Sequence, residues 1–232
     1  MLTMDASALS NNIAKLRQRV RLSAEKSQRK ECDIRILAAS KTRDANTLKA
    51  ASELGLRDFG ENYLQEALVK IEQLQALDIC WHFIGPMQSN KTRPIAEHFD
   101  WVHSVDRAKI ARRLSEQRPE GLKPLQVCLQ VNVSNEASKS GVSLDELAPL
   151  VEAVAALPNI VLRGLMAIPE ASDDTEVQRG AFRKLHTALL EMQALAPTMD
   201  TLSMGMSGDL EAAIAEGATM VRIGTDIFGP RD

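Results

Sequence analysis

Ile34-Arg35-Ile36-Leu37-Ala38-Ala39-Ser40-Lys41-Thr42 is a short apolar run that ends abruptly in three polar residues. A run of this length and composition predicts a buried β-strand followed by a loop. The same pattern recurs along the chain, so this run is the first of a series. The eight candidate strands are Ile34–Ala39, Arg57–Gly60, Trp81–Gly85, Trp101–Ser104, Leu125–Val133, Leu162–Ile168, Thr201–Met204 and Thr219–Ile223.

Amphipathic helical patterns separate these candidate strands. Apolar residues recur there at intervals of three and four, the spacing of the buried face of a helix, most clearly over 64–74, 144–154 and 182–192. Residues that favour helix ends fall where the helices should begin or stop. They are a Ser143–Glu146 capping box, the candidate N-caps Asp44 and Asp106, and the glycines Gly55 and Gly217.

Alternating strands and helices predict a parallel sheet, and eight such units predict an α/β fold of the closed (β/α)8 TIM-type barrel class. An open, doubly wound sheet is the alternative that the same pattern could build. Nine residues follow the last strand, too few for a full eighth helix, whereas residues 1–30 carry an extra helical pattern. We expect this N-terminal helix, with Leu9, Ile13, Leu16 and Val20 on one face, to cover the wall that an eighth helix would cover.

The composition limits the class of protein. The 232 residues are 44% hydrophobic, 25% charged and 3% aromatic, which excludes a disordered chain, a collagen-like repeat and a disulfide scaffold. No apolar run approaches the ~18 residues of a membrane span, and residues 1–10 lack a signal-peptide layout, so we expect a cytoplasmic protein with no membrane partner. With no linker or internal repeat, residues 1–232 are expected to form a single domain.

The charge and the cysteine content indicate neither a nucleic-acid partner nor a metal site. The 28 basic and 31 acidic residues give a formal charge of −3, and we interpret the basic cluster at 17–30 as a solvated helix face, so no nucleic-acid partner is expected. Cys32, Cys80 and Cys128 are far apart and lie in or beside apolar stretches. They predict buried free thiols, and no metal site is expected.

The loops after the strands are where functional residues of a barrel gather. Two glycine-bearing loops, Gly205-Met206-Ser207-Gly208 and Gly224-Thr225, follow the last two strands. Both can direct backbone N–H groups at an anion, and this is the usual phosphate site of barrel enzymes. A phosphorylated ligand is one interpretation, and glycines that merely permit turns are the other. Asp209 and Glu211 count against a dianion here unless their side chains face solvent.

Lys41 stands at the end of the first apolar strand. There the lysine would be partly desolvated, which disfavours the ammonium form, and a neutral amine can attack an aldehyde. An ordinary solvated lysine is the alternative. In a closed barrel the first strand pairs with the eighth, which would place Lys41 beside the Gly224-Thr225 loop. An aldehyde and a phosphate on one molecule describe pyridoxal 5′-phosphate (PLP) or, less specifically, a sugar phosphate.

Arg222 helps to choose between these ligands. It lies in the last candidate strand, between two apolar residues. Because arginine stays protonated, it would donate a hydrogen bond to a pyridine nitrogen and keep that nitrogen unprotonated, which weakens PLP as an electron sink. Pairing of Arg222 with Glu170 or Asp226 is the alternative.

A series of motifs runs through the chain. It comprises Leu37-Ala38-Ala39-Ser40-Lys41-Thr42, Phe59-Gly60-Glu61-Asn62, residues 81–91 (WHFIGPMQSNK), Val131-Asn132-Val133, Lys139-Ser140-Gly141, Arg163-Gly164-Leu165-Met166, residues 203–207 (SMGMS) and residues 220–225 (MVRIGT). In this order the motifs resemble, almost end to end, the YggS/PROSC family of PLP-binding homeostasis proteins. That family is related in fold to the barrel domain of alanine racemases.

The resemblance implies a PLP-binding role and a set of contacts for the cofactor. The implied residues are Lys41 as the internal aldimine, Asn62 near the ring substituents, Met166 in the pocket wall, Ser207, Gly224 and Thr225 at the phosphate, and Arg222 at the ring nitrogen. Lys139 is a weaker candidate for a transfer lysine, with a solvated loop lysine as the alternative.

The same residues favour a carrier over an enzyme. A racemase needs two bases, and in alanine racemases the second comes from a separate domain, which is not found in this chain. Its only tyrosine, Tyr63, is explained more simply by packing, and the histidines fall outside the loops of the site. We therefore expect a non-enzymatic, monomeric protein that holds PLP and delivers it to PLP-dependent apoenzymes in intracellular homeostasis. The alternatives are a weak amino-acid racemase and a Schiff-base aldolase for a sugar phosphate.

Overall fold

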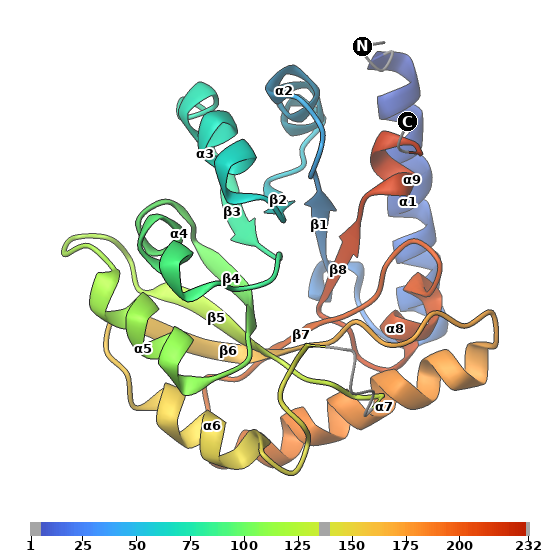
Figure 1. Ribbon diagram of the computed structural model, residues 1–232. Coiled ribbons are helices and arrows are strands. Elements are labelled where there is room, and N and C mark those ends of the chain that lie inside the picture. Colours follow the sequence, from blue (N-terminus) through green and yellow to red (C-terminus); the bar gives the residue numbers. More distant parts are fainter. Residues whose placement is uncertain (1–5, 135–139, 231–232) are drawn as a thin grey trace.

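Eight parallel strands close into one barrel, in the order in which they follow along the chain (Figure 1). The computed structural model describes residues 6–134 and 140–230. β1 pairs with β2 on one side and with β8 on the other, so the predicted (β/α)8 fold is confirmed and the open sheet is wrong. The strands are β1 (Arg35–Ala39), β2 (Asp58–Glu61), β3 (Cys80–Phe83), β4 (Trp101–Val105), β5 (Leu125–Gln130), β6 (Ile160–Met166), β7 (Thr201–Ser203) and β8 (Met220–Ile223).

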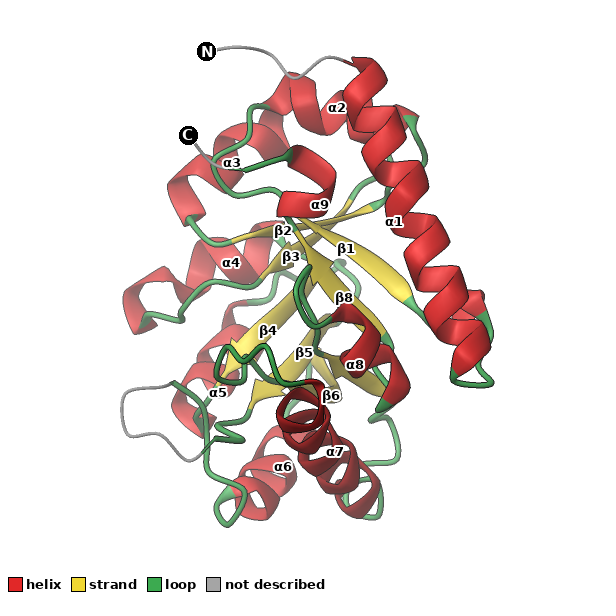
Figure 2. Cartoon of the chain, turned by 90° about the vertical axis from the view of Figure 1, so that its right-hand side faces the viewer, coloured by secondary structure: helices red, strands yellow, loops and turns green. Residues whose placement is uncertain are grey.

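A helix follows each strand on the outside of the barrel (Figure 2), and the main hydrophobic core lies between the two layers. None of the helices in the described part of the chain combines the length and apolar character that a membrane span needs. The helices are α1 (Ala6–Lys26), α2 (Ala45–Glu53), α3 (Leu64–Gln73), α4 (Thr92–His98), α5 (Ala108–Gln117), α6 (Leu147–Ala155), α7 (Thr175–Met192), α8 (Leu210–Ala215) and α9 (Thr225–Phe228), with 3-10 turns η1 (Glu31–Asp33) and η2 (Ser89–Lys91).

The N-terminal helix α1 closes the outer layer beside β8 and β1. The helix that follows β8, α9, has only four residues, and α1 packs against it and against α8 and α2 (Figure 1). The predicted apolar face is confirmed, since Leu9, Ile13, Leu16 and Val20 are all at most 2% exposed. The extra helix therefore covers the wall that a longer eighth helix would cover.

Helix starts follow the predicted caps only in part. Asp44 caps α2 as expected, because its side chain accepts a backbone hydrogen bond at 2.8 Å. Asp106 does not cap α5: Arg107 holds the N-cap position and Asp106 pairs with it. The Ser143–Glu146 capping box is also wrong, since α6 begins after Glu146 and the two side chains bond each other at 2.8 Å.

The inside of the barrel is more polar than the branched aliphatic filling that is usual for this fold. Its apolar part includes a small cluster of Trp101, Cys128 and Met166, separate from the main core. His82 and His103, on β3 and β4, are fully buried beside it. A polar interior must be hydrogen-bonded throughout to be stable, and these two histidines are bonded to each other.

The prediction of buried thiols holds for one cysteine of three. Cys128 is buried, Cys80 is half-buried and Cys32 is exposed, because β1 begins only after Cys32. The Cys80 sulfur lies within 4.8 Å of ligand atoms of Asp58 and His82. Those two residues bond each other at 2.9 Å, and burial raises the pKa of the Cys80 thiol, which keeps it protonated.

Candidate functional site

A cavity of about 260 Å³ opens at the carboxyl end of the barrel. Its wall is formed by residues at or just beyond the ends of β1, β2, β3, β6, β7 and β8, so the fold brings together segments that are distant in sequence. Arg43, Ile84 and Phe228 contribute to the wall without having been predicted. Six residues predicted for the site also line it: Lys41, Asn62, Ser207, Arg222, Gly224 and Thr225.

Met166, the seventh predicted residue, does not line this cavity. It is 1% exposed and packs inside the barrel against Trp101 and Cys128, because it is the last residue of β6 rather than part of the following loop. Ile168, two residues further on and 44% exposed, lies in the cavity wall instead. The expectation that Met166 forms part of the wall is corrected accordingly.

Two other residues that the sequence singled out stand apart from the wall. Tyr63, interpreted as a packed residue, is 54% exposed, because it holds the N-cap position of α3 at the surface. The packing explanation for Tyr63 is therefore wrong. Lys139, the candidate transfer lysine, lies outside the described residues, so its role stays a prediction.

Lys41 lies in the loop that follows β1, and side chains of α3 bond to the backbone of the residues before and after it. Lys41 itself is half-buried. The next residue, Thr42, adopts a left-handed φ of 66°, and its backbone N–H donates to Glu66 Oε1 at 2.6 Å. The Ser40 carbonyl, on the other side, accepts from Lys70 Nζ at 2.9 Å. These bonds fix the backbone from which the Lys41 side chain leaves the barrel.

A buried ion pair beneath the Lys41 loop joins α3 to β2. Lys70 Nζ lies 2.8 Å from Glu61 Oε1 and 2.5 Å from Glu66 Oε1, and the Ser40 hydroxyl donates to Glu61 at 2.6 Å. Burial raises the pKa of the Glu61 carboxyl by more than Lys70 lowers it, and the second oxygen of Glu61 has no hydrogen-bond partner. The position of the Lys41 loop therefore depends on the Glu61 carboxylate, whose charge is unfavourable in this buried place.

Arg222 is held at the cavity by groups of the barrel interior and is 5% exposed. Nη1 donates to the carbonyl of Ser203 and to its hydroxyl, the latter at 2.9 Å, and Nη2 donates to the Ala167 carbonyl at 2.8 Å. Asp226, one of the alternative partners, pairs with Arg19 instead. Burial lowers the pKa of Arg222 to about 10, so the guanidinium is still a cation at neutral pH.

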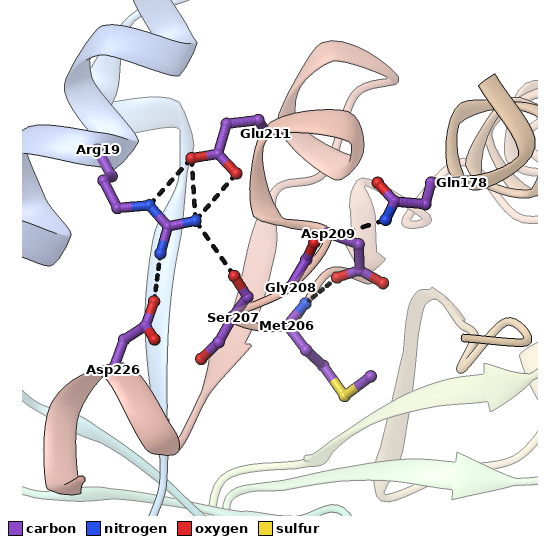
Figure 3. A network of polar contacts seen from close by, with 8 residues as sticks. All are labelled: Arg19, Gln178, Met206, Ser207, Gly208, Asp209, Glu211 and Asp226. Atoms are coloured by element: carbon purple, nitrogen blue, oxygen red, sulfur yellow. Dashed lines mark hydrogen bonds and ion pairs between the residues drawn. The ribbon is translucent and has the colours of Figure 1, made fainter. Parts of the chain in front are cut away.

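One guanidinium from α1 joins the two glycine-bearing loops (Figure 3). Arg19 donates to both oxygens of Glu211 at 2.9 Å, to the Ser207 carbonyl at 3.1 Å and to the carboxylate of Asp226. It thus ties the loop after β7 to the first turn of α9. The interpretation of residues 17–30 as a solvated face is wrong at Arg19, and the sequence carries no signal for its distant partners.

The acidic residues beside these loops are engaged by protein groups (Figure 3). Burial alone would raise the pKa of Glu211, but the hydrogen bonds and charge of Arg19 leave that pKa below its usual value. Asp209 accepts from the Met206 N–H at 2.5 Å, and burial raises its pKa. Gly224 is the N-cap of α9, whose first N–H groups have no carbonyl partner within the helix. The loops can therefore receive an anion despite their acidic neighbours.

The sequence is similar to known proteins along nearly its whole length. The family model of the alanine racemase N-terminal domain matches residues 4–232. A pyridoxal phosphate homeostasis protein of Pseudomonas aeruginosa is 60% identical over 226 residues, which is 97% of each chain. The protein of the same name from Escherichia coli is 49% identical over 227 residues, again 97% of each chain.

Solved structures agree with these sequence matches. PipY of Synechococcus elongatus, solved with PLP bound, is 35% identical with a TM-score of 0.84, over 95% of this chain and 100% of that one. An alanine racemase of Corynebacterium glutamicum shares the fold, with 18% identity and a TM-score of 0.68 over 97% of this chain and 62% of that one. The chain therefore belongs to the family of pyridoxal phosphate homeostasis proteins, within the group defined by the alanine racemase N-terminal domain.

Proposed function

We propose that the chain binds PLP in the cavity at the carboxyl end of the barrel and acts in PLP homeostasis. The observation that carries the proposal is the convergence of a lysine amine, a buried arginine and two glycine-bearing loops on a space of about 260 Å³. The names of the relatives and the PLP-bound structure of PipY support it.

The cavity suits the polar parts of this cofactor. The side-chain oxygen of Asn62 is buried without a hydrogen-bond partner, so it can accept a bond from a ring hydroxyl. A Cβ at Gly224 would come within 3.3 Å of the Ala39 carbonyl oxygen, so glycine lets this loop approach β1. The hydroxyls of Ser207 and Thr225, with the N–H groups at the start of α9, are the donors that a phosphate requires.

Lys41 and Arg222 would hold the reactive parts of the cofactor. The Lys41 amine would link to the aldehyde carbon as an imine, with loss of water. Bound PLP supplies an electron-withdrawing ring that can stabilise a carbanion. Arg222 would donate a hydrogen bond to the ring nitrogen, and as a cation with a pKa of about 10 it opposes protonation of that nitrogen.

We further propose that the protein holds PLP without strong catalysis and, as a monomer, delivers it to PLP-dependent apoenzymes. Arg222 limits carbanion chemistry, and the buried His82 and His103 bond each other rather than serving as bases at the cavity. Sedimentation at micromolar concentration should give the mass of one chain. Exchange of the alanine α-proton at ordinary enzymatic rates would instead favour the weak racemase.

A visible absorption spectrum before and after borohydride, followed by peptide mass mapping, tests the proposed function. Wild-type protein should carry a PLP chromophore, and the reduced label should map to Lys41. Lys41→Ala should remove the chromophore, whereas Lys49→Ala, which changes an exposed lysine on α2, should retain it. A wild-type protein that takes up no PLP but cleaves a sugar phosphate would favour the aldolase, and a chromophore surviving in Lys41→Ala would show that another lysine is used.

A further inference from the structure

Five side chains form a hydrogen-bonded chain across the inside of the barrel, from the cavity to the amino end of β2. Arg222 Nη1 donates to Ser203 Oγ at 2.9 Å, and Ser203 Oγ lies 2.7 Å from His103 Nδ1. His103 Nε2 lies 2.9 Å from His82 Nδ1, and His82 Nε2 lies 2.9 Å from Asp58 Oδ1. The three middle residues are 0% exposed, so water does not compete for these bonds.

Burial favours the neutral form of both imidazoles in this series. Burial lowers the pKa of His82, despite the carboxylate of Asp58, and it lowers the pKa of His103 still further. The Trp101 ring stacks on His82 with 5.5 Å between ring centroids and 14° between planes, which holds the imidazole in place. The other titratable or charged groups that face the two rings are Arg35, Asp100, Arg222 and the Cys80 thiol.

The two end residues of this hydrogen-bonded series, Arg222 and Asp58, set the direction of every hydrogen bond in it. Arginine has only donors, so Ser203 Oγ accepts from Arg222. An ionised aspartate has only acceptors, and Asp58 has Arg35 Nη1 at 3.4 Å, so His82 must carry its proton on Nε2.

The middle of the chain follows from these ends. With its proton on Nε2, neutral His82 presents Nδ1 as an acceptor, and His103 must donate to it from Nε2. His103 Nδ1 is then an acceptor, which receives the hydroxyl proton of Ser203. Every donor meets one acceptor, and each bond polarises the next in the same sense.

We propose that this chain is a positioning device, in which protons point uniformly from Arg222 through Ser203, His103 and His82 to Asp58 and hold the guanidinium in one orientation toward the cavity. The effect on the ligand rests on the proposed function, whereas the direction of the chain is a property of the protein alone. His82 and His103 act through Arg222, so they are positioning residues rather than catalytic ones.

The backbone carbonyls of Ser203 and Ala167 also hold Arg222, but its bond to the Ser203 hydroxyl depends on the far members of the series, because Ser203 has only one proton. While His103 takes that proton, the serine lone pairs face Arg222. Without the acceptor at His103, the hydroxyl proton must find another direction, and the alignment of the lone pairs with Nη1 is lost. Removing the His103 imidazole, which does not contact the ligand, should therefore weaken the hydrogen bond between Arg222 and the ring nitrogen of PLP.

Nitrogen-15 NMR of the histidine rings in the protein without PLP tests the direction of the chain. Both His82 and His103 should show a proton on Nε2 only, and the pKa of each ring should lie below the ordinary histidine value. Assignments come from His82→Gln and His103→Gln. A proton on Nδ1 of either ring, or titration near the ordinary histidine value, overturns the proposal even if PLP binds as expected.

A second measurement tests the effect at the cavity. PLP-loaded His103→Leu should bind the cofactor about tenfold more weakly, and the pH at which the bound chromophore changes should shift by about one unit. His103→Gln keeps a donor and an acceptor, so its PLP affinity and the pH at which its chromophore changes should be close to those of wild type. An unchanged affinity and pH profile in His103→Leu overturns the positioning role. If wild-type protein binds no PLP, the proposed function fails, while the NMR experiment still decides the direction of the chain.

Discussion

Single buried ionisable side chains set the chemistry beneath the cavity, and Glu61 shows how closely attraction and burial compete. Its side chain is 0% exposed and lies 2.8 Å from the Lys70 ammonium, which favours the carboxylate. Burial opposes the charge more strongly, so the pKa of Glu61 is raised in the folded protein. The ion pair therefore positions the Lys41 loop more than it stabilises the fold.

Glu61→Gln should flatten the pH dependence of stability. A carboxyl whose folded-state pKa is raised contributes stability fully below its unfolded value, near pH 4.5, and loses that contribution as the pH rises through the folded-state pKa. The free energy of unfolding of wild type minus that of the variant should therefore fall as the pH rises above about 4.5 in urea titrations. Glu53→Gln, at an exposed glutamate of α2, is the matched control for the change of residue type. A difference that grows with pH would mean that the pairing with Lys70 dominates.

Charged residues in or directly after an apolar strand could be predicted for the site, and residues that act through distant contacts could not. Arg222 carries a charge between two apolar strand residues, and Lys41 carries one directly after an apolar strand, a conflict with burial that is visible in the sequence. Arg19 and Ser203 carry no such conflict, because their partners lie on elements that only the closed barrel brings near. Met166 was assigned to the wall by the family resemblance alone, whereas it is the last residue of β6 and packs inside the barrel.

At the scale of elements, short helices and the loops before them rely on α1 for their arrangement. α8 has six residues and α9 has four, both too short to be stable alone. Their cohesion depends on packing against α1 and on the Arg19 guanidinium that bonds to both (Figure 3). The glycine signals at helix ends were reliable here, since Gly55 and Gly217 follow α2 and α8 with φ of 89° and 101°.

Arg19→Ala should weaken PLP binding more than it weakens the fold. The Arg19 side chain is 37% exposed, so the loss of unfolding free energy should stay below about 1 kcal/mol. The variant leaves Glu211 and Asp226 without their shared cation beside the proposed phosphate loops, so PLP affinity should fall several-fold at low salt. The loss should shrink at high salt, where charge repulsion is screened. Equal affinities in Arg19→Ala and in Arg21→Ala, whose exposed partner is Glu25, would contradict this role.

At the scale of the whole molecule, the barrel could be predicted because its parallel strands repeat the same pattern and each must pack against a helix. All eight strands were found, with ends shifted by up to three residues. The polar interior could not be predicted, because alternation shows which positions face inward but not that His82 and His103 would meet there. The predicted role of α1 in place of an eighth helix was confirmed, since its apolar stripe is buried and the helix packs against α8, α9 and α2.

Because α1 completes the outer layer, its apolar stripe should be as important to stability as the core of the barrel. Leu16 is 1% exposed within that stripe, so Leu16→Ala leaves a cavity and should lower the free energy of unfolding by about 2 to 4 kcal/mol. Leu22→Ala, on the same helix but 41% exposed, should change it by less than about 0.5 kcal/mol. Urea unfolding followed by far-ultraviolet circular dichroism measures both. If α1 were only an appendage, Leu16→Ala would unfold that helix in a separate early transition and leave the midpoint of the main transition unchanged, whereas an integral wall helix requires the main transition itself to move.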